Sequence, residues 1–570
     1  MLKKKGVLII TILAAVLIFV TVVAESTYDT LYSYLKMSSD VAYRIKSRYV
    51  DEIDSKTLID SGIRGMLDIL DPFSEYLEAK DYDLLQEMTS GKYSGLGMSI
   101  MQKEGVIIIV APMEGTPAYR MGLRAGDKIL KINGKSTTGM STSEASSLMR
   151  GPAGTTVTLT IGRESVEEPL EYTIERAVIE IKTVPFYGAF EKNGQKLGYV
   201  RLARFGEEAN AELDAAFTDL LKQNVKGIIF DLRANGGGLL DQAVKVSNYF
   251  LAKGSEVTST KGRTMDQDRT LFANNDPLIP PDLPVVVLVN EMSASASEIV
   301  AGAVQDWDRA VIIGNTTFGK GLVQQVYPLG QDAALKLTTA KWYVPSGRCI
   351  QKDIRSTRHP ESLIDSTLAD SMTFDTTSAK GRSNKSKEVY HTKGGRIVYG
   401  GGGVVPDVVV EDARLNALEL NLERLSMFFD FAVKYANENP KTPEDFEVTP
   451  QLIDQFRQYL KDKKFSYKSE LELDLEKLEK TIIEQKKEAE YAKALADIRA
   501  QIEIDKEQQF NQSLDYISRS IKRDILTNLY GEKAVYRQIM LKKDPYIDKA
   551  VEILTSPKEY SAILEGGARR

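Results

Sequence analysis

The feature that most constrains this fold is an alternation of apolar runs and amphipathic segments between residues 180 and 350. Short aliphatic runs at 196–202, 225–232 and 283–289 are separated by segments with helical spacing that end near 223 or begin near 239. Strands that alternate with helices favour parallel pairing in a layered α/β core. Because ligands bind such cores beyond the carboxyl ends of the strands, functional residues should follow the apolar runs.

Three segments that follow these runs carry small and polar residues. They are Asp-Leu-Arg-Ala-Asn-Gly-Gly-Gly at 231–238, Ser-Ala-Ser-Ala-Ser at 293–297 and Thr-Phe-Gly-Lys-Gly at 317–321. A serine between a strand and a helix lies where unpaired N–H groups favour an oxyanion, and glycine lets a backbone approach a ligand closely. Taken singly, such serines are more often helix caps and such glycines more often tight turns. Their occurrence together favours a reaction centre.

The small number of histidines limits which residue could act as the general base for a nucleophilic serine. The chain has two, His359 and His391, and both lie in a polar stretch without clear periodicity. A Ser-His-Asp triad or a histidine zinc site is therefore not expected, and we expect neither a metal nor a cofactor. Lys320 is flanked by glycines and apolar residues. Desolvation favours the neutral amine of a lysine, so a Ser-Lys pair is the most economical arrangement.

The motifs also occur in a recognisable order along the chain. Besides the three segments above, the chain carries Leu-Asp-Pro-Phe-Ser-Glu-Tyr at 70–76, Tyr-Ser-Gly-Leu-Gly at 93–97 and Pro-Ser-Gly-Arg at 345–348. Over residues 40–410 the sequence resembles the carboxyl-terminal processing proteases, also called tail-specific proteases. The resemblance implies a serine endopeptidase that cleaves proteins near their C-termini. It also implies an α/β core similar to those of the crotonases and Clp proteases.

The resemblance assigns roles to individual residues. It implies Ser295 as the nucleophile, Lys320 as the general base 25 residues later and Gln324 as the residue that orients the lysine. It also implies that the backbone N–H groups of Ala296 and Gly237 form the oxyanion hole.

Residues 91–170 have short β-rich runs at 106–110, 128–132 and 156–161 and resemble a PDZ domain. A PDZ groove adds a peptide as an extra strand and captures its terminal carboxylate on backbone N–H groups. The expected partners are therefore proteins or peptides with free C-termini. The carboxylate-binding loop implied by the resemblance consists of Gly95, Leu96, Gly97 and Met98.

The N-terminus predicts where the protein is located. Three lysines at 3–5 precede an uncharged apolar run at 6–24. Its length suits a membrane anchor, although the small residues at its end are also typical of a cleaved signal peptide. In either case residue 25 onward lies outside the cytoplasm. We expect a protein of the cell envelope, anchored in the inner membrane and facing the periplasm, or periplasmic after cleavage of residues 1–25.

The remaining segments complete the expected domain organisation. A helical segment at 26–90 precedes the PDZ domain, and the catalytic domain covers 171–411 with an exposed polar insertion at 352–396. A helical domain at 412–570 follows. It is a candidate dimerisation element, substrate clamp or adaptor-docking surface.

Two other functions remain as alternatives to the protease. The same domains would suit a peptide-binding protein in which the reactive residues are idle. The expected core would also suit a crotonase-like enzyme of acyl thioesters, although the export signal disfavours that reading because such cofactors are cytoplasmic. A net charge of −6 disfavours nucleic-acid binding, which requires clustered basic residues.

Overall fold

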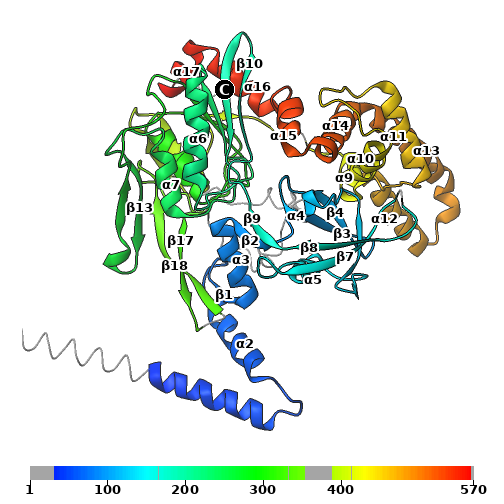
Figure 1. The fold of residues 1–570 in the computed structure, drawn as a ribbon, viewed down its shortest axis with the longest axis horizontal. Helices are drawn as coiled ribbons and strands as arrows, with labels where there is room; N and C mark the ends of the chain where they lie inside the picture. Colours follow the sequence, from blue (N-terminus) through cyan, green and yellow to red (C-terminus); the bar gives the residue numbers. More distant parts are fainter. Residues whose placement is uncertain (1–30, 165, 331–332, 353–387, 412–413, 567–570) are drawn as a thin grey trace, which may run out of the picture. The chain divides into compact units, whose positions relative to one another are not determined.

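The computed structural model describes residues 31–164, 166–330, 333–352, 388–411 and 414–566 (Figure 1). Within these ranges the chain forms two compact units. One contains the chain up to residue 82 together with 324–338, and the other contains 83–323 and the segments that follow 338. The apolar run at 6–24, interpreted above as an anchor or signal peptide, lies outside the described residues. Among the helices that are described, none is long and apolar enough to cross a membrane.

The smaller unit begins with helical residues 31–48 and α2 (Ser55–Leu67), as the sequence predicts. Asp54 caps α2 by accepting a hydrogen bond from the Thr57 N–H. The Asp-Pro-Phe-Ser motif forms a turn in which the Asp71 carboxylate accepts from the Phe73 N–H at 2.9 Å. This turn leads into β1 (Glu75–Glu78), which pairs antiparallel with the first half of β18 (Ala333–Tyr343).

The segment expected to be a PDZ domain lies in the larger unit and has its own apolar core. Its antiparallel sheet has the order β3-β4-β5-β7-β8, and the short strand β6 pairs with β5. The elements are β2 (Lys92–Gly95), β3 (Met98–Lys103), β4 (Val106–Pro112), α4 (Pro117–Arg120), β5 (Lys128–Ile132), β6 (Lys135–Ser136), α5 (Thr142–Met149), β7 (Thr156–Gly162), β8 (Leu170–Glu175) and β9 (Ala177–Glu180). All three strands predicted here are present as β4, β5 and β7.

A six-stranded sheet forms the α/β core, with the order β10-β11-β12-β15-β16-β21. All its strands run parallel except the edge strand β10, which pairs antiparallel with β11. The strands are β10 (Phe186–Lys192), β11 (Gln195–Arg201), β12 (Ile228–Asp231), β15 (Val285–Val289), β16 (Val311–Gly314) and β21 (Val408–Val409). The prediction of a mainly parallel α/β core is confirmed.

Helices cover both faces of this sheet because alternate side chains of each strand point in opposite directions. On one face, Val285 and Val287 pack with α6 (Ala209–Lys222), α7 (Leu240–Ser247) and α8 (Ala296–Asp306). On the other face, Val286 and Leu288 pack with the π-helical turn η3 (Tyr536–Met540) and α16 (Pro545–Leu554). Helices α16 and α17 (Pro557–Leu564), red in Figure 1, therefore form the second layer over this sheet rather than belonging only to a separate tail.

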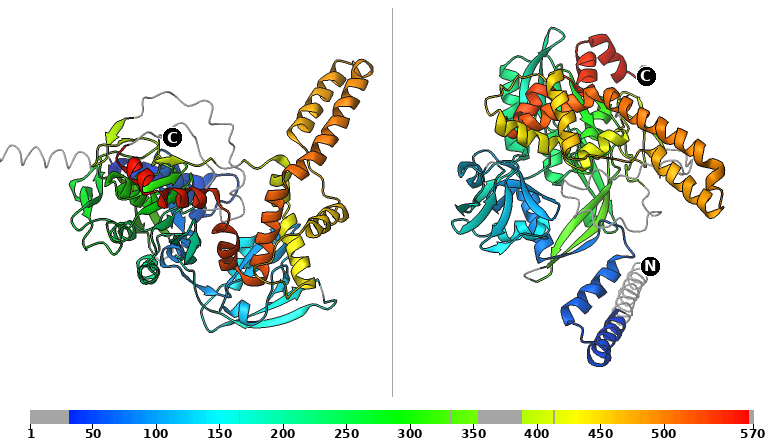
Figure 2. Two further views of the ribbon diagram at one scale, coloured as in Figure 1. Left: turned by 90° about the horizontal axis from the view of Figure 1, so that it is seen from above. Right: turned by 90° about the vertical axis from the view of Figure 1, so that its right-hand side faces the viewer.

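The rest of the tail is helical, as predicted, and packs around a core of its own. Its helices are α9 (Ala417–Arg424), α10 (Met427–Glu438), α11 (Pro450–Asp462), α12 (Glu470–Glu484), α13 (Glu488–Gln512), α14 (Leu514–Tyr530) and α15 (Glu532–Val535). Helices α12 and α13 form a long hairpin (Figure 2). Helix α10 contacts the PDZ domain, where Lys103 forms an ion pair with Asp430 and donates to the Leu425 carbonyl at 3.2 Å.

A second group of strands is antiparallel. Its members are β1, β13 (Glu256–Gly262), β14 (Arg269–Phe272), β17 (Leu322–Pro328) and β18, and the second half of β18 pairs with β13. Residues 388–399, partly within the expected insertion, form the hairpin of β19 (Val389–His391) and β20 (Ile397–Tyr399). They are not uniformly exposed, because the Arg396 guanidinium is buried against Asp308 and Asp407. Residues 353–387 of the insertion lie outside the described residues.

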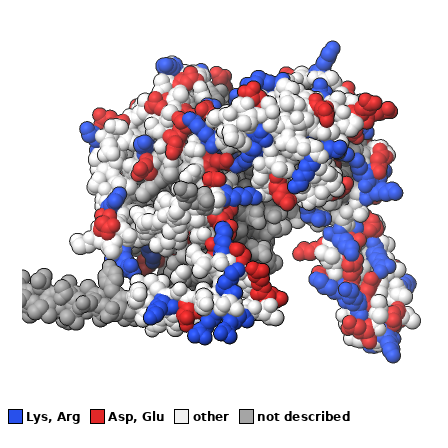
Figure 3. Space-filling view, turned by 60° about the horizontal axis from the view of Figure 1, so that its bottom comes forward, with Lys and Arg blue, Asp and Glu red and all other residues white. Residues whose placement is uncertain are grey.

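On the face drawn in Figure 3, basic and acidic side chains are interspersed, and neither sign gathers into a broad patch.

Candidate active site

The nucleophile candidate lies at a sharp bend between a strand and a helix. Strand β15 ends at Val289, and Ser295 is the N-cap of α8 with φ of 54° and ψ of −113°. An N-cap usually has extended backbone angles, so this residue is in a conformation that costs about 1–3 kcal/mol and persists only when its surroundings hold it. A strained strand-to-helix turn is also how α/β-hydrolases expose a nucleophilic serine. Ser295 is therefore more than a helix cap.

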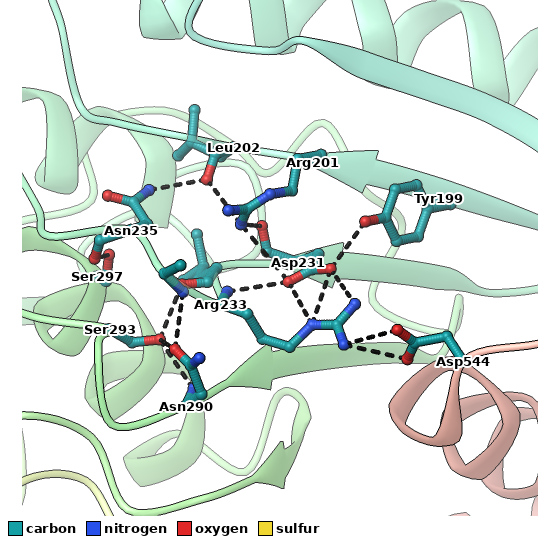
Figure 4. A network of polar contacts seen from close by, with 12 residues as sticks. Tyr199, Arg201, Leu202, Asp231, Arg233, Asn235, Asn290, Ser293, Ser297 and Asp544 are labelled. Carbon is teal, nitrogen blue, oxygen red and sulfur yellow. Dashed lines mark hydrogen bonds and ion pairs between the residues drawn. The ribbon is translucent and has the colours of Figure 1, made fainter. Parts of the chain in front are cut away.

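The three serines of the segment have different environments; Figure 4 shows the outer two, Ser293 and Ser297. Ser293 and Ser297 are fully buried, and their hydroxyls donate to the carbonyls of Leu232 and Asn235, each at 2.8 Å. Ser295, between them, is half-buried. The outer serines thus fasten the bend to the 231–238 turn, and the middle one remains accessible for chemistry.

The glycine turn passes directly beside this bend. Gly237 has φ of 100°, and a Cβ built on it would lie 2.7 Å from the Ala294 carbonyl oxygen and 2.9 Å from the Ala296 nitrogen. Only glycine fits there. The Ala296 N–H belongs to the first turn of α8, where N–H groups have no intrahelical acceptor. Both residues predicted for the oxyanion hole are thus adjacent to Ser295. The Gly237 N–H donates to the Asn235 Oδ1 at 2.9 Å. An oxyanion would therefore have to share this N–H with the Asn235 oxygen or displace that oxygen.

A buried carboxylate joins the nucleophile bend to the lysine loop. Glu298 is fully buried, and its Oε2 accepts hydrogen bonds from the N–H groups of Ser295 and Lys320, each at 2.9 Å. Its Oε1 accepts from the Thr317 hydroxyl at 2.5 Å and the Gly319 N–H at 2.7 Å. Burial raises the pKa of Glu298, and these hydrogen bonds oppose the rise. Because two of the donors share one oxygen, the backbones at Ser295 and Lys320 pass within about 6 Å of each other.

The lysine loop follows the neighbouring strand β16. The Lys320 side chain is half-buried. Around it the backbone is fixed, since the Gly321 N–H donates to the Gln351 side chain at 2.7 Å and the Lys352 N–H donates to the Gly319 carbonyl at 2.9 Å. The three predicted motifs therefore follow β12, β15 and β16, adjacent parallel strands, as expected from the sequence.

Gln324 lies on β17, and its amide donates to the Thr338 hydroxyl at 3.2 Å. That hydroxyl donates in turn to Asp71 at 3.0 Å, so Gln324 is linked to the Asp-Pro-Phe-Ser turn within the smaller unit. Its proposed action on Lys320 stays a prediction.

The residues predicted for carboxylate binding form the loop between β2 and β3. Leu96 is buried in the PDZ core. Gly97 has φ of 77°, and a Cβ there would lie 2.4 Å from Thr116. The Gly97 carbonyl accepts from the Met113 N–H at 2.9 Å and the Thr116 hydroxyl at 2.8 Å, so the loop is rigid. None of the four residues lines the cavity of about 430 Å³ beside β2 and β9, whose walls include Tyr93, Arg150 and Val178.

Sequence reasoning missed the roles of several charged residues. Glu298 stands three residues after Ser295, the spacing of a capping box, which was a usable signal. Asp231 and Arg233 lie in the predicted turn but had no assigned role. Asp544 pairs with Arg233, but the sequence shows it only as a candidate N-cap before Pro545. In the described part of the chain, no group of three or more His, Cys, Asp or Glu side chains is arranged to hold a metal ion.

Comparison with known proteins identifies the families to which the domains belong. Residues 196–358 match Peptidase family S41 and residues 108–163 match the PDZ domain. Residues 418–554 match the C-terminal helical domain of probable PDZ-proteases, and residues 24–81 match the N-terminal domain of the activating protease CtpB. These matches define a PDZ-containing S41 peptidase with additional N-terminal and C-terminal helical domains.

Individual relatives narrow the assignment. The chain is 41% identical over 342 residues to the carboxy-terminal-processing protease of Bartonella bacilliformis, covering 59% of this chain and 77% of that protein. It is 36% identical over 330 residues to the carboxy-terminal processing protease CtpA of Bacillus subtilis, covering 58% and 68%. A solved photosystem II D1 C-terminal processing protease is 31% identical over 54% of this chain and 83% of that chain, with a TM-score of 0.34. The chain belongs to the carboxy-terminal processing protease family.

Proposed function

We propose that this peptidase is a serine endopeptidase in which Ser295 is the nucleophile and Lys320 the general base. The observation that carries the proposal is the shared hydrogen bonding of the two residues' backbones to Glu298. The neutral Lys320 amine takes the proton of the Ser295 hydroxyl as the oxygen attacks the peptide carbonyl. The resulting oxyanion receives hydrogen bonds from the N–H groups of Ala296 and Gly237. The lysine then protonates the leaving amine, and water hydrolyses the acyl-enzyme.

We propose further that substrates are proteins cut near their free C-termini. The support is a rigid loop at Gly95–Met98 at the start of β3, the kind of site from which PDZ domains bind terminal carboxylates beside a strand. The lysine-flanked apolar run at 6–24 supports a location in the cell envelope, either tethered to the inner membrane or released into the periplasm. Substrates would then be envelope or exported proteins.

The test is proteolysis of an unfolded protein by the wild type, Ser295→Ala and Lys320→Arg. Arginine stays protonated, so Lys320→Arg should abolish turnover and leave the fold intact. Lys352→Arg, an exposed lysine next to the same loop, is the matched control and should retain full activity. Substantial turnover by folded Lys320→Arg would show that another group takes the serine proton. No cleavage by the wild type, with peptide binding retained, would instead favour a peptide-binding protein with idle residues.

A further inference from the structure

The guanidinium of Arg233 lies between two carboxylates, one close to it in the sequence and one distant, Asp231 and Asp544 (Figure 4). Its Nε and Nη2 donate to Asp231 at 2.6–3.1 Å, and its Nη1 donates to both oxygens of Asp544 at 3.0 and 3.1 Å. Tyr546 adds a cation–π contact, with the guanidinium carbon 4.7 Å from its ring centroid. Asp544 is 311 residues beyond Arg233 in the chain.

This group of charges is buried, so its pairing matters. Asp231 is 1% exposed and Asp544 is 8% exposed. Burial would raise the pKa of Asp231, but the positive charges of Arg233 and Arg201 lower it to about 2. The Tyr199 hydroxyl also donates to Asp231 at 2.8 Å. A buried guanidinium that lost one of its two carboxylates would keep part of its charge uncompensated, which is costly in an interior.

Asp544 is itself held in place by the core. Its carboxylate caps α16 by accepting from the N–H groups of Tyr546 and Ile547, each at 3.0 Å. Helix α16 is fixed to the sheet, since Ile547, Val551 and Leu554 are buried against its strands. The same carboxylate therefore caps the N-terminus of a fixed helix and pairs with Arg233.

The residues that follow Arg233 bond to residues on both sides of Ser295 in the chain. The Ala234 N–H donates to Asn290 at 2.7 Å, and Ala234 has a positive φ of 50°. The Asn235 carbonyl accepts from the Ala294 N–H at 3.0 Å and from the Ser297 hydroxyl at 2.8 Å. Gly237 then passes beside Ser295, as described above. A displacement of Arg233 would move this turn relative to the nucleophile.

We propose that Asp544 is a positioning residue for catalysis: through Arg233 it orients the 234–237 turn against Ser295, so the C-terminal segment forms part of the active centre. This inference rests on the proposed serine protease chemistry. It does not make Asp544 a group that contacts the substrate.

The test separates the charge of Asp544 from its capping role. Asparagine caps helices as well as aspartate does, so Asp544→Asn keeps α16 capped and removes only the charge that pairs with Arg233. Asp548→Asn removes a charge from the same helix, where Asp548 pairs with Lys192 at the surface, and is the matched control. If Asp544→Asn does not fold, Asp544→Ser, another uncharged cap, replaces it.

Two readouts are needed. The first is steady-state cleavage of a C-terminal peptide substrate, in which Asp544→Asn should lower kcat by about 10- to 100-fold with little change in KM, because small displacements at a reacting centre are costly. The second is amide hydrogen exchange at residues 234–237 in the intact protein. It should become about tenfold faster or more in Asp544→Asn and stay unchanged in Asp548→Asn.

The exchange measurement does not depend on activity. A wild type without protease activity would therefore refute the proposed function, and the structural coupling between Asp544 and the turn would still be measured. Equal kcat and equal exchange in Asp544→Asn and Asp548→Asn would overturn the inference. Faster exchange with unchanged kcat would overturn the catalytic part of it.

Discussion

Neighbouring glycines in the 235–238 turn are under different constraints. Gly237 has a positive φ, and a Cβ there would meet the Ala294 carbonyl, the Ser295 Cβ and the Ala296 nitrogen at 2.7–2.9 Å. Gly236 has no such φ, and a Cβ there would meet nothing within 4 Å. An added methyl group would therefore clash with the Ser295 bend at position 237 and would meet open space at position 236.

We accordingly expect Gly237→Ala to lower kcat by about 10²- to 10³-fold, the usual effect of losing an oxyanion donor. The new methyl group would meet two backbone atoms and the Ser295 Cβ, none of which can move aside easily. The turn must therefore shift away from Ser295. Gly236→Ala should retain near wild-type kcat. The measurement is cleavage of a peptide substrate by both variants, with circular dichroism to confirm folding. Equal activity in the two variants would show that Gly237 does not face the reacting carbonyl.

The limits of sequence reasoning are also clear for single residues. That the segments of Ser295 and Lys320 follow neighbouring strands was predictable, because small residues and glycines surround both residues; the catalytic roles of the two residues stay a prediction. Glu298 was not assigned, although it receives four hydrogen bonds, because a glutamate in the first turn of a helix is ordinarily explained by capping and the helix dipole. Its burial beneath both loops is a tertiary property that local sequence does not contain.

Among the elements, the central strands β11, β12 and β15 of the parallel sheet were predictable, and the strands of the antiparallel group were not. Strand β15 is a continuous run of Val and Leu with every residue buried, which is the pattern of a sheet covered on both faces. Strand β13 instead reads Glu-Val-Thr-Ser-Thr-Lys-Gly, and buried, partly buried and exposed residues follow one another along it without regular alternation. Its pairing with β18 depends on residues about 80 positions later, such as Tyr343 opposite Ser259.

The PDZ loop offers a prediction at this scale. Gly97→Ala should weaken binding of a peptide with a free C-terminus by about tenfold or more, because the methyl group would lie 2.4 Å from Thr116 and displace the backbone donors. Gly115→Ala is the matched control: it has the same φ of 77° and open space around its Cβ position. Alanine strains the backbone at both positions because φ is positive at both. Only the methyl group of Gly97→Ala also clashes with Thr116.

The measurement is fluorescence anisotropy with the same peptide ending in a carboxylate or an amide. The amidated peptide should bind weakly to the wild type, since its terminal charge is absent. If both peptides bind equally, or if Gly115→Ala is affected as strongly as Gly97→Ala, the loop is not the carboxylate site.

At the scale of the whole molecule, the chain's end returns to its catalytic sheet. This docking could not be predicted, because a Lys/Glu-rich helical tail shows which face of each helix is apolar but not what covers it. The apolar residues of α16 differ little in sequence from those of the helices before it. Tyr560 on α17 also bonds to the sheet backbone, donating to the Val285 carbonyl at 3.1 Å and accepting from the Val285 N–H at 3.0 Å.

This docking leads to a prediction about truncation. A chain that ends at Lys543 lacks α16 and α17 and uncovers one face of the sheet. Ile547, Val551, Ile553 and Leu554 are each at most 3% exposed. Burial of one such side chain contributes about 1.5–3 kcal/mol, so the four together approach the entire free energy of unfolding of a domain, about 5–15 kcal/mol. We therefore expect this truncation to be insoluble or inactive.

A chain that ends at Glu565 keeps both helices and should match the full-length protein in solubility, melting temperature and peptide cleavage. Because the first truncation also removes Asp544, the Asp544→Asn variant separates loss of the ion pair from loss of the apolar cover: it should remain soluble and folded, with a melting temperature lowered by the loss of the buried ion pair. A soluble, active protein that ends at Lys543 would show that the sheet is stable without its second layer.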